Sequence, residues 1–331
     1  MIRLAMIGLG VQGGRLIESV HGKSRELAIT MGVTIDPTEA AVVRDKYGIP
    51  VHDRLGVALE DPDIDGVVLA TPPMVHAEQT RAAARAGKHV LCEKPFTLAL
   101  PEAVEAAAAC RDAGVVLGVA FTHRLHPAMQ ELSRLVRNGE LGTILHAEGN
   151  YSHDWGASYD PKSWKALPEA SPAKTRFFTG NGVHTLDALI GLFGEVSSVY
   201  ARGTRRAVPL DLLDVVVVHL EFAGGMTATV TSLDGTPFIW RLQVYGTEGW
   251  AEVRDFHALS LHRGGKMVTT TFPQVSVLRA GLEAFAAAIK GIVPYSVSVT
   301  DALQGVAAYE GVIASLLSGD RLSVASPTAV H

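Results

Sequence analysis

Short apolar runs recur at regular intervals along roughly the first 120 residues, and stretches with helical spacing separate them. The runs are continuous instead of alternating between apolar and polar residues. Continuous runs are typical of strands buried on both faces of a parallel sheet that helices cover. The pattern therefore predicts a doubly wound α/β fold. The predicted strands are 2–7, 27–35, a short one around Val51, 66–70, 89–92 and 115–120.

The rhythm changes after about residue 122, where closely spaced strands follow one another with few helices between them. Glycine pairs such as Gly224-Gly225 and Gly264-Gly265 suit hairpin turns, so an antiparallel sheet is expected. We predict two domains, residues 1–121 and an α+β domain over 122–331. The predicted elements of the second domain are strands 144–151, 196–204, 214–222, 226–232, 239–246 and 250–253, and helices 127–138, 278–289 and 300–317.

Composition narrows the classes of partner. The formal net charge of the 331 residues is -5, and the basic residues are scattered, which argues against a nucleic acid or an anionic membrane as partner. No stretch approaches the roughly 18 to 20 apolar residues that span a bilayer. Cys92 and Cys110 fall in different predicted elements, so they suggest neither a disulfide framework nor a metal site. The composition predicts a globular, cytoplasmic protein with no bound metal.

The glycine turn Gly8-Leu9-Gly10-Val11-Gln12-Gly13 follows the first predicted strand and precedes a helical pattern. In such turns the first glycine allows the tight bend, the second admits a pyrophosphate, and the third lets the helix pack on the strand. The phosphates then lie at a helix N-terminus, which favours anions. We interpret Gly8, Gly10, Val11, Gln12 and Gly13 as a dinucleotide-binding turn; the alternative is a purely structural turn.

Asp36 ends the second predicted strand, 23 residues beyond Gly13. A carboxylate there accepts hydrogen bonds from both hydroxyls of the adenine ribose and repels a 2′-phosphate. No basic residue follows directly, because the next positions are Pro37, Thr38 and Glu39. The sequence therefore predicts NAD and disfavours NADP, unless Asp36 only caps the following helix.

A specific string, His89-Val90-Leu91-Cys92-Glu93-Lys94-Pro95, places a charged pair at the carboxyl end of a parallel strand, where ligands bind in open α/β folds. Together with Thr71-Pro72-Pro73-Met74-Val75-His76, it resembles the Gfo/Idh/MocA oxidoreductase family. The resemblance continues through 121–127, 139–142, 182–187 and 245–249, and so spans nearly the whole chain.

The resemblance implies a Rossmann domain followed by a domain with a large, mostly antiparallel sheet. One face of that sheet would carry the substrate pocket, and the other commonly forms the interface of a homodimer or homotetramer. The implied activity is hydride transfer between NAD and a secondary hydroxyl or ketone of a sugar, a sugar derivative or a cyclic polyol. The implied cofactor contacts beyond the glycine turn and Asp36 are Thr71, Pro72, His76, Glu93, Lys94 and Arg124.

Two residues match the catalytic positions of the family. Lys94 would lie near the nicotinamide, where an ammonium stabilises a developing alkoxide. The bond between this lysine and the following proline is often cis in the family. His184 matches an acid/base histidine, and an imidazole can take the hydroxyl proton while the hydride leaves. The alternatives are a solvated lysine at a strand end and a buried histidine at a helix start.

Aromatic residues alternate with polar ones in 153–165, a pattern that suits a carbohydrate because ring faces stack on C–H patches. The alternative is a surface loop without a binding role, which its aromatic residues anchor to the protein. One departure matters: Gly180 stands where members with the polyol-dehydrogenase pattern carry an aspartate. A non-catalytic NAD-binding regulator is therefore an alternative, and an NAD-dependent glycosidase of the same family is a third. The expected substrate contacts are Lys94, His153, Asp154, Trp155, Trp164, Asn181 and His184.

Overall fold

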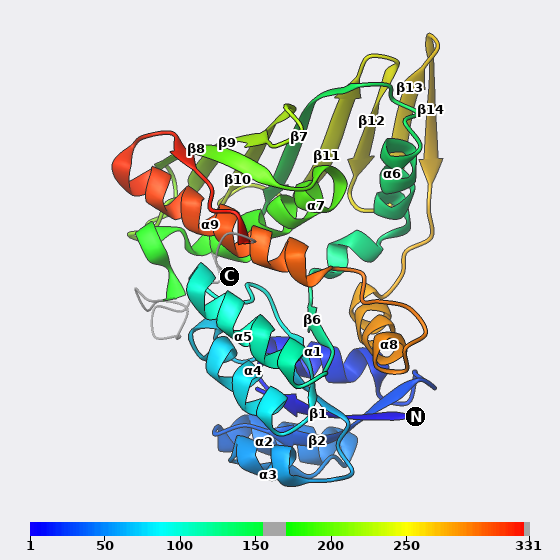
Figure 1. Cartoon of the computed structure of the whole chain (residues 1–331), viewed down its shortest axis with the longest axis vertical. Helices are drawn as coiled ribbons and strands as arrows, with labels where there is room; N and C mark the ends of the chain where they lie inside the picture. The colour runs from blue at the N-terminus through cyan, green and yellow to red at the C-terminus, as the bar shows by residue number, and fades with distance from the viewer. Residues whose placement is uncertain (155–169, 328–331) are drawn as a thin grey trace. The chain divides into compact units, whose positions relative to one another are not determined.

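The structure is a computed structural model that describes residues 1–154 and 170–327 (Figure 1). It divides into a first unit, Met1–Thr122 with Ser276–Ala302, and a second unit, His123–Val275 with Leu303–His331. The predicted division instead assigned everything after residue 121 to the second domain. Residues 276–302 group with the first unit because α8 (Val277–Ile289) packs on α1 (Val11–Val20), and Lys290 pairs with Glu26 at 2.6 Å.

The first unit contains a parallel six-stranded sheet in the order β3-β2-β1-β4-β5-β6, which confirms the predicted doubly wound class. Strands such as β4 are buried at every position, as their continuous apolar runs predicted. The order reverses between β1 and β4, so the carboxyl ends of these strands form the topological switch point where ligands bind. The strands are β1 (Ile2–Ile7), β2 (Leu27–Val33), β3 (Val51–His52), β4 (Gly66–Leu69), β5 (His89–Cys92) and β6 (Leu117–Val119).

Helices of the first unit follow these strands in turn, as the helical spacing of the sequence indicated. Besides α1 and α8 they are α2 (Pro37–Tyr47), α3 (Leu55–Glu60), the short η1 (Pro73–Val75), α4 (His76–Arg85) and α5 (Leu100–Asp112).

The second unit contains a nine-stranded sheet in the order β14-β13-β12-β11-β7-β10-β9-β8-β15. Only β10 and β7 pair in parallel among these described strands, so the mostly antiparallel sheet is confirmed. The strands are β7 (Ile144–Ser152), β8 (Val196–Thr204), β9 (Val215–Phe222), β10 (Thr227–Leu233), β11 (Ile239–Gly246), β12 (Gly249–Arg254), β13 (Ala258–Arg263), β14 (Lys266–Thr271) and β15 (Leu322–Ser323).

Strands β13 and β14 were not among the predicted strands, although their connecting turn at Gly264-Gly265 was. Every residue of β14 is exposed, because it is the edge strand of the sheet. Its sequence therefore carries no alternation between buried and exposed positions, and that alternation is the signal that reveals a strand.

Helices α6 (Pro127–Arg137), α7 (Val183–Phe193) and α9 (Val299–Ser318) belong mainly to the second unit, and α7 and α9 lie in front of its sheet in Figure 1. Contact between α7 and β7 is close at Gly149, where a Cβ would lie 2.1 Å from the Thr185 methyl. Trp240 is fully buried on β11. The opposite face of the sheet stays partly open to solvent, as at Val217, which is 38% exposed.

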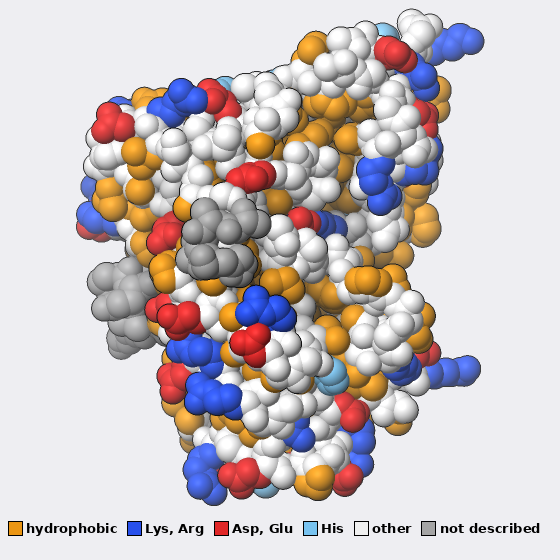
Figure 2. All heavy atoms as spheres, viewed as in Figure 1, with side chains coloured by type: hydrophobic (Ala, Val, Ile, Leu, Met, Phe, Trp, Pro, Cys, Tyr) orange, Lys and Arg blue, Asp and Glu red, His pale blue; other side chains and the backbone are white. Residues whose placement is uncertain are grey.

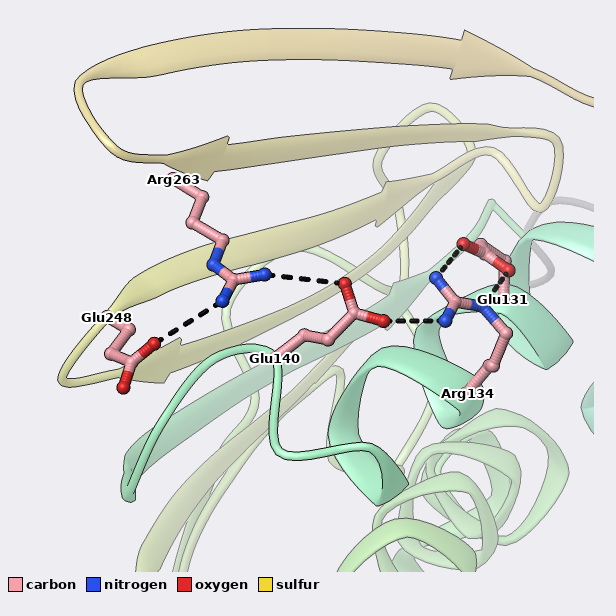
Figure 3. Close-up of polar contacts among 5 residues, drawn as sticks. All are labelled: Glu131, Arg134, Glu140, Glu248 and Arg263. Atoms are coloured by element: carbon pink, nitrogen blue, oxygen red, sulfur yellow. Dashed lines mark hydrogen bonds and ion pairs between the residues drawn. The ribbon is translucent and has the colours of Figure 1, made fainter.

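Two of the family-like strings, 139–142 and 245–249, meet at one corner of the second unit. Thr143 and Thr247 exchange backbone and side-chain hydrogen bonds, and the Glu248 N–H donates to the Leu141 carbonyl at 3.0 Å. Figure 3 shows charged side chains around this corner, with Arg263 pointing toward both Glu140 and Glu248. These strings therefore have a structural role: they join the end of α6 to the β11–β12 hairpin.

Candidate active site

The glycine turn lies between β1 and α1. Gly8 has φ +90°, and a Cβ there would lie 2.8 Å from the Ala70 carbonyl carbon at the end of β4. A Cβ on Gly13 would lie 2.0 Å from the Gly8 carbonyl oxygen, so the helix and the strand can approach only without a side chain. Helix α1 has no side-chain cap and no acidic residue in its first turn. Its first N–H groups thus form an anion site that fits the pyrophosphate of a dinucleotide.

Asp36 caps α2, as the alternative interpretation expected. Its side chain accepts the N–H of Thr38 at 2.7 Å and that of Glu39 at 3.3 Å, both at Oδ1. Both capping hydrogen bonds go to Oδ1, so the cap does not use Oδ2. The cap and the predicted ribose contact are compatible.

Glu93 links the glycine turn to the loop that follows β5. The Gln12 amide donates to Glu93 Oε1 at 2.7 Å, and the Lys94 N–H donates to Oε2 at 3.2 Å. Burial raises the pKa of Glu93, although Lys94 and Gln12 oppose that shift. The Lys94–Pro95 peptide bond is cis, as the resemblance implied. Both Glu93 oxygens bond to protein groups, so this carboxylate fixes the position of the Lys94 backbone.

His76 joins the ends of β4 and β5 from inside the protein. It is 1% exposed; Nδ1 lies 3.0 Å from the Pro95 carbonyl oxygen, and Nε2 lies 2.8 Å from that of Thr71. Burial lowers its pKa, although these carbonyls oppose the shift. The Thr71 hydroxyl donates to Gln79 at 2.6 Å, and Pro72 directly precedes η1. His76 thus holds the two loops together, and its predicted cofactor contact stays a prediction.

In the second unit, His184 is the second residue of α7 and is 7% exposed. A π-helical turn, Phe178–Gly182, precedes α7, and such turns occur frequently at functional sites. The Thr179 and Tyr309 hydroxyls lie 2.8 Å apart and tie this turn to α9. The local fold therefore fixes the start of α7, which carries His184.

Asn181 lies within the π-helical turn and is 6% exposed. Its Nδ2 has no hydrogen-bond partner among the described residues. A Cβ on Gly180 would lie 3.4 Å from an Nη of Arg176. A guanidinium thus borders the position where the resemblance places a carboxylate.

Arg124, a predicted cofactor contact, forms an ion pair with Asp187 within the second unit. Its Nε donates to Oδ2 at 2.8 Å and its Nη2 donates to Oδ1 at 2.6 Å. Asp187 is 2% exposed, so the pair is largely buried. The pair joins η2 (Thr122–Leu125) to α7, one turn beyond His184. Its guanidinium therefore supports the helix that carries His184, and a role toward the cofactor stays a prediction.

An aromatic cluster surrounds His184, and sequence reasoning did not identify it as part of a site. His153, a predicted substrate contact, packs edge-to-face on the cluster member Phe238 with ring centroids 5.6 Å apart, while Asp154 is exposed. Trp155 and Trp164 lie outside the described residues. The only sequence signal for the cluster was that His123 and His126 fall in the family-like string 121–127. We define the cluster as His123, His126, Tyr151, Phe238, Trp240 and Phe256.

A cavity of about 250 Å³ opens beside this cluster, between His126, Phe256 and His257. Burial, aided by the nearby His257, lowers the pKa of His126 to about 4. His126 is therefore neutral at physiological pH. The cavity wall combines an aromatic ring with polar groups.

The parallel sheet with its glycine turn, the lysine after β5 and the histidine-bearing second unit together define a two-domain, dinucleotide-dependent oxidoreductase. Residues 2–121 match the family model of an oxidoreductase family with an NAD-binding Rossmann fold, and residues 129–252 match the GFO/IDH/MocA C-terminal domain. The chain belongs to the Gfo/Idh/MocA family of oxidoreductases.

Relatives of this chain include dehydrogenases of known substrate. It is 31% identical to D-xylose 1-dehydrogenase (NADP(+)) 2 of Haloferax volcanii, over 87% of this chain and 88% of that protein. It is 28% identical to the scyllo-inositol 2-dehydrogenase (NAD(+)) of Bacillus subtilis, over 75% and 72%. The match to the oxidoreductase YrbE of Bacillus subtilis, at 34% identity, spans 58% of this chain and only 56% of that protein.

Among solved structures, the aldose-aldose oxidoreductase from Caulobacter crescentus, complexed with glycerol, superposes with a TM-score of 0.87 at 25% identity. The alignment covers 98% of this chain and 99% of that one. A likeness over this extent supports the same order of a Rossmann domain and a sheet domain along the chain.

Proposed function

We propose that this protein is a dehydrogenase that transfers a hydride between NAD and a secondary hydroxyl or ketone of a sugar, a sugar derivative or a cyclic polyol. The observation that carries the proposal is the position of Lys94. It follows β5 at the carboxyl edge of the parallel sheet, and Glu93 ties its backbone to the glycine turn through Gln12. The relatives that act on xylose and scyllo-inositol support the substrate class.

The proposal gives each group of residues a distinct task. Bound NAD supplies the hydride acceptor or donor. The first N–H groups of α1 bind the pyrophosphate, and Asp36 Oδ2 accepts from the adenine ribose, which favours NAD over NADP. The Lys94 ammonium stabilises charge that develops on the substrate oxygen. A neutral His184 accepts the hydroxyl proton at a ring nitrogen during oxidation and returns it during reduction.

The test follows reduced cofactor while the purified protein is supplied with NAD or NADP and a panel of aldoses, inositols and sugar acids. We expect Lys94→Ala and His184→Ala each to lower kcat by roughly 10²-fold or more and to leave NAD affinity within a few-fold, because each acts on the reacting oxygen. Arg85→Ala, at the exposed end of α4, is the matched control.

Three outcomes separate the alternatives. Turnover that both variants retain would rule out the proposed roles of Lys94 and His184. Tight NAD binding without turnover of any substrate would favour the regulator, for which the loss of a carboxylate at Gly180 is the supporting observation. Release of a sugar without net reduced cofactor would favour the glycosidase.

We propose in addition that the enzyme forms a homodimer or homotetramer through the open face of the nine-stranded sheet. The half-exposed threonines of β10 and the exposed Val217 of β9 support this assignment. Figure 2 shows acidic and basic side chains interspersed over the visible face of the molecule. Light scattering of Val217→Glu against the parent chain tests the interface.

We propose, separately, that the protein is cytoplasmic. Both cysteines are buried free thiols, which suits the reducing cytoplasm. Among the described residues, no helix has the length and apolar character needed to cross a membrane.

A further inference from the structure

His123 and His184 form a stacked pair of imidazole rings. Their centroids are 3.8 Å apart and their planes differ by 19°. His123 lies in η2 and His184 in α7, and the Arg124–Asp187 ion pair joins the same two elements. This buried ion pair therefore holds together the two elements that carry the stacked rings.

Phe256 also packs against His123. Its ring centroid is 4.6 Å from that of His123, and it stacks on Trp240 at 4.5 Å and on His126 at 4.3 Å. Asp255 and Phe256 both have positive φ, at 51° and 66°, in the turn between β12 and β13. Such a turn normally carries Asn-Gly, and a phenylalanine in it is strained. Packing of the Phe256 ring on Trp240 and His126 compensates for this strain and holds Phe256 in place.

Charge restricts what the stacked pair can do. Two imidazolium rings at 3.8 Å repel each other strongly, because like charges within about 4 to 6 Å disfavour ionisation. Titratable groups that face the pair include Tyr151 on β7, whose ring contacts both imidazoles, and His126 after η2, whose ring contacts His123. His126 stays neutral, since its pKa is about 4, and Arg124 and Asp187 compensate each other. The close stack therefore favours at most one imidazolium, and so at most one positive charge, on the pair.

We propose that His123 is a positioning residue for His184: its stacked ring fixes the orientation of the His184 imidazole, and the repulsion between two charged rings couples their titrations. The inference rests on the proposed acid/base role of His184. A ring held in one orientation presents its nitrogen to the substrate hydroxyl without searching other rotamers, which is the usual benefit of preorganisation. The coupling also sets the acidic limit of the pH range in which His184 is a base.

The coupling can be measured without any substrate. Histidine ring signals of ¹³C-labelled protein would be followed from about pH 4.5 to about pH 9, around the ordinary imidazole range. We expect His184 and His123 to titrate in two shared steps, separated by more than about one pH unit. In His123→Phe, which keeps the aromatic ring and removes the titrating group, His184 should show a single step. His126→Phe is the matched control and should leave the two steps unchanged.

Activity supplies the second arm. His123→Ala should lower kcat by roughly 10- to 100-fold with KM within a few-fold, because the His184 ring loses its support. His123→Phe should recover most of that kcat and should lose the lower step of the pH profile of kcat/KM. Equal kcat losses in both variants would reduce His123 to a structural residue.

The two proposals fail in different ways. Identical titration of His184 in the parent chain and in His123→Phe would overturn the coupling, whatever the activity. Full activity of His184→Ala would overturn the acid/base role while the ring titrations still reported the stacked pair. If His123→Ala does not fold, the comparison of the parent chain with His123→Phe is sufficient.

Discussion

Individual side chains that the sequence predicted to bind the cofactor also have structural roles in this protein. Asp36 was predicted from its position at a strand end to bind ribose, and in the structure it caps α2 through Oδ1. His76 and Glu93 were predicted to contact the cofactor, and both are buried. His76 ties the ends of β4 and β5 together, and Glu93 ties the glycine turn to the loop after β5. A sequence motif identifies such residues. It does not show whether a residue contacts the ligand or instead holds neighbouring residues in place.

The proposed ribose contact of Asp36 can be separated from its capping role by substitution. In Asp36→Ser the hydroxyl still caps α2, so thermal stability should stay close to that of the parent chain. Removal of the carboxylate should weaken selection against NADP, raising the ratio of NADP to NAD efficiency by roughly tenfold or more. Asp36→Ala should change cofactor preference equally and should also cost about 1 kcal/mol of stability. Unchanged cofactor preference in both variants would leave Asp36 as a cap alone.

Asp214 offers a test of pH dependence at one residue. It is 1% exposed and accepts the N–H groups of Arg206, Ala207 and Val208 at 2.6 to 2.8 Å. Burial alone would raise its pKa, but these donors outweigh burial and hold the pKa below 3.8. Since the folded pKa is lowered, Asp214 stabilises the fold above about pH 4, and this contribution is lost as the pH falls through the folded pKa.

Substitution of Asp214 should therefore be costly and pH-dependent. Asp214→Asn should lower the free energy of unfolding by about 2 kcal/mol at neutral pH, with a smaller difference near pH 3. Asp211→Asn, in the same loop but exposed, should change stability by less than about 0.5 kcal/mol. Urea unfolding at both pH values measures this, and equal losses for the two variants would contradict the role of the buried bonds.

At the scale of elements, glycines are required where a helix and a strand approach each other closely. The glycine turn works because α1 meets β1 without an intervening side chain. The same principle places α7 on β7 at Gly149, and so fixes the helix that carries His184. The spacing of the glycines was visible in the sequence, but the partners across each contact were not, since they lie far away along the chain.

Two neighbouring glycines of α1 make a matched pair of variants. Gly13→Ala would place a methyl 2.0 Å from the Gly8 carbonyl oxygen, whereas a Cβ on Gly14 meets nothing within 4 Å. We expect Gly13→Ala to weaken NAD binding by at least roughly tenfold and to destabilise the fold. Gly14→Ala should bind NAD normally and gain up to about 1 kcal/mol, because alanine is the better helix residue. Calorimetric titration with NAD would detect the contrast, and similar affinities for the two variants would refute it.

At the scale of the whole molecule, the chain enters the second unit after Thr122, returns to the first for 276–302, and then completes the second. The return follows from the packing of α8 on α1 and from the pairing of Lys290 with Glu26. The sequence predicted α8 as a helix within one residue of its observed start, but helical periodicity does not say which core the apolar face will join.

This chain path predicts where NAD stabilises the protein. At about 100 times its Kd, NAD should add about 2.7 kcal/mol to the stability of the unit that binds it. Hydrogen exchange should slow in α1 and also in α8, although α8 is more than 250 residues away in sequence. Peptides from the β13–β14 hairpin should exchange at an unchanged rate. Slowing in α1 without slowing in α8 would contradict their membership in one cooperative unit.

The sequence by itself determined the local and repetitive features of this protein. Continuous apolar runs gave the parallel sheet, glycine spacing gave the dinucleotide turn, and the string around Lys94 gave the family, because each signal is complete within a short segment. Tertiary structure alone decided which distant side chains meet. Segments from separate strands and helices meet where His123 stacks on His184 and where Phe256 packs on His123. They also meet through the buried hydrogen bonds of His76 and Glu93. Such contacts depend on packing between elements, which no local pattern of residues encodes.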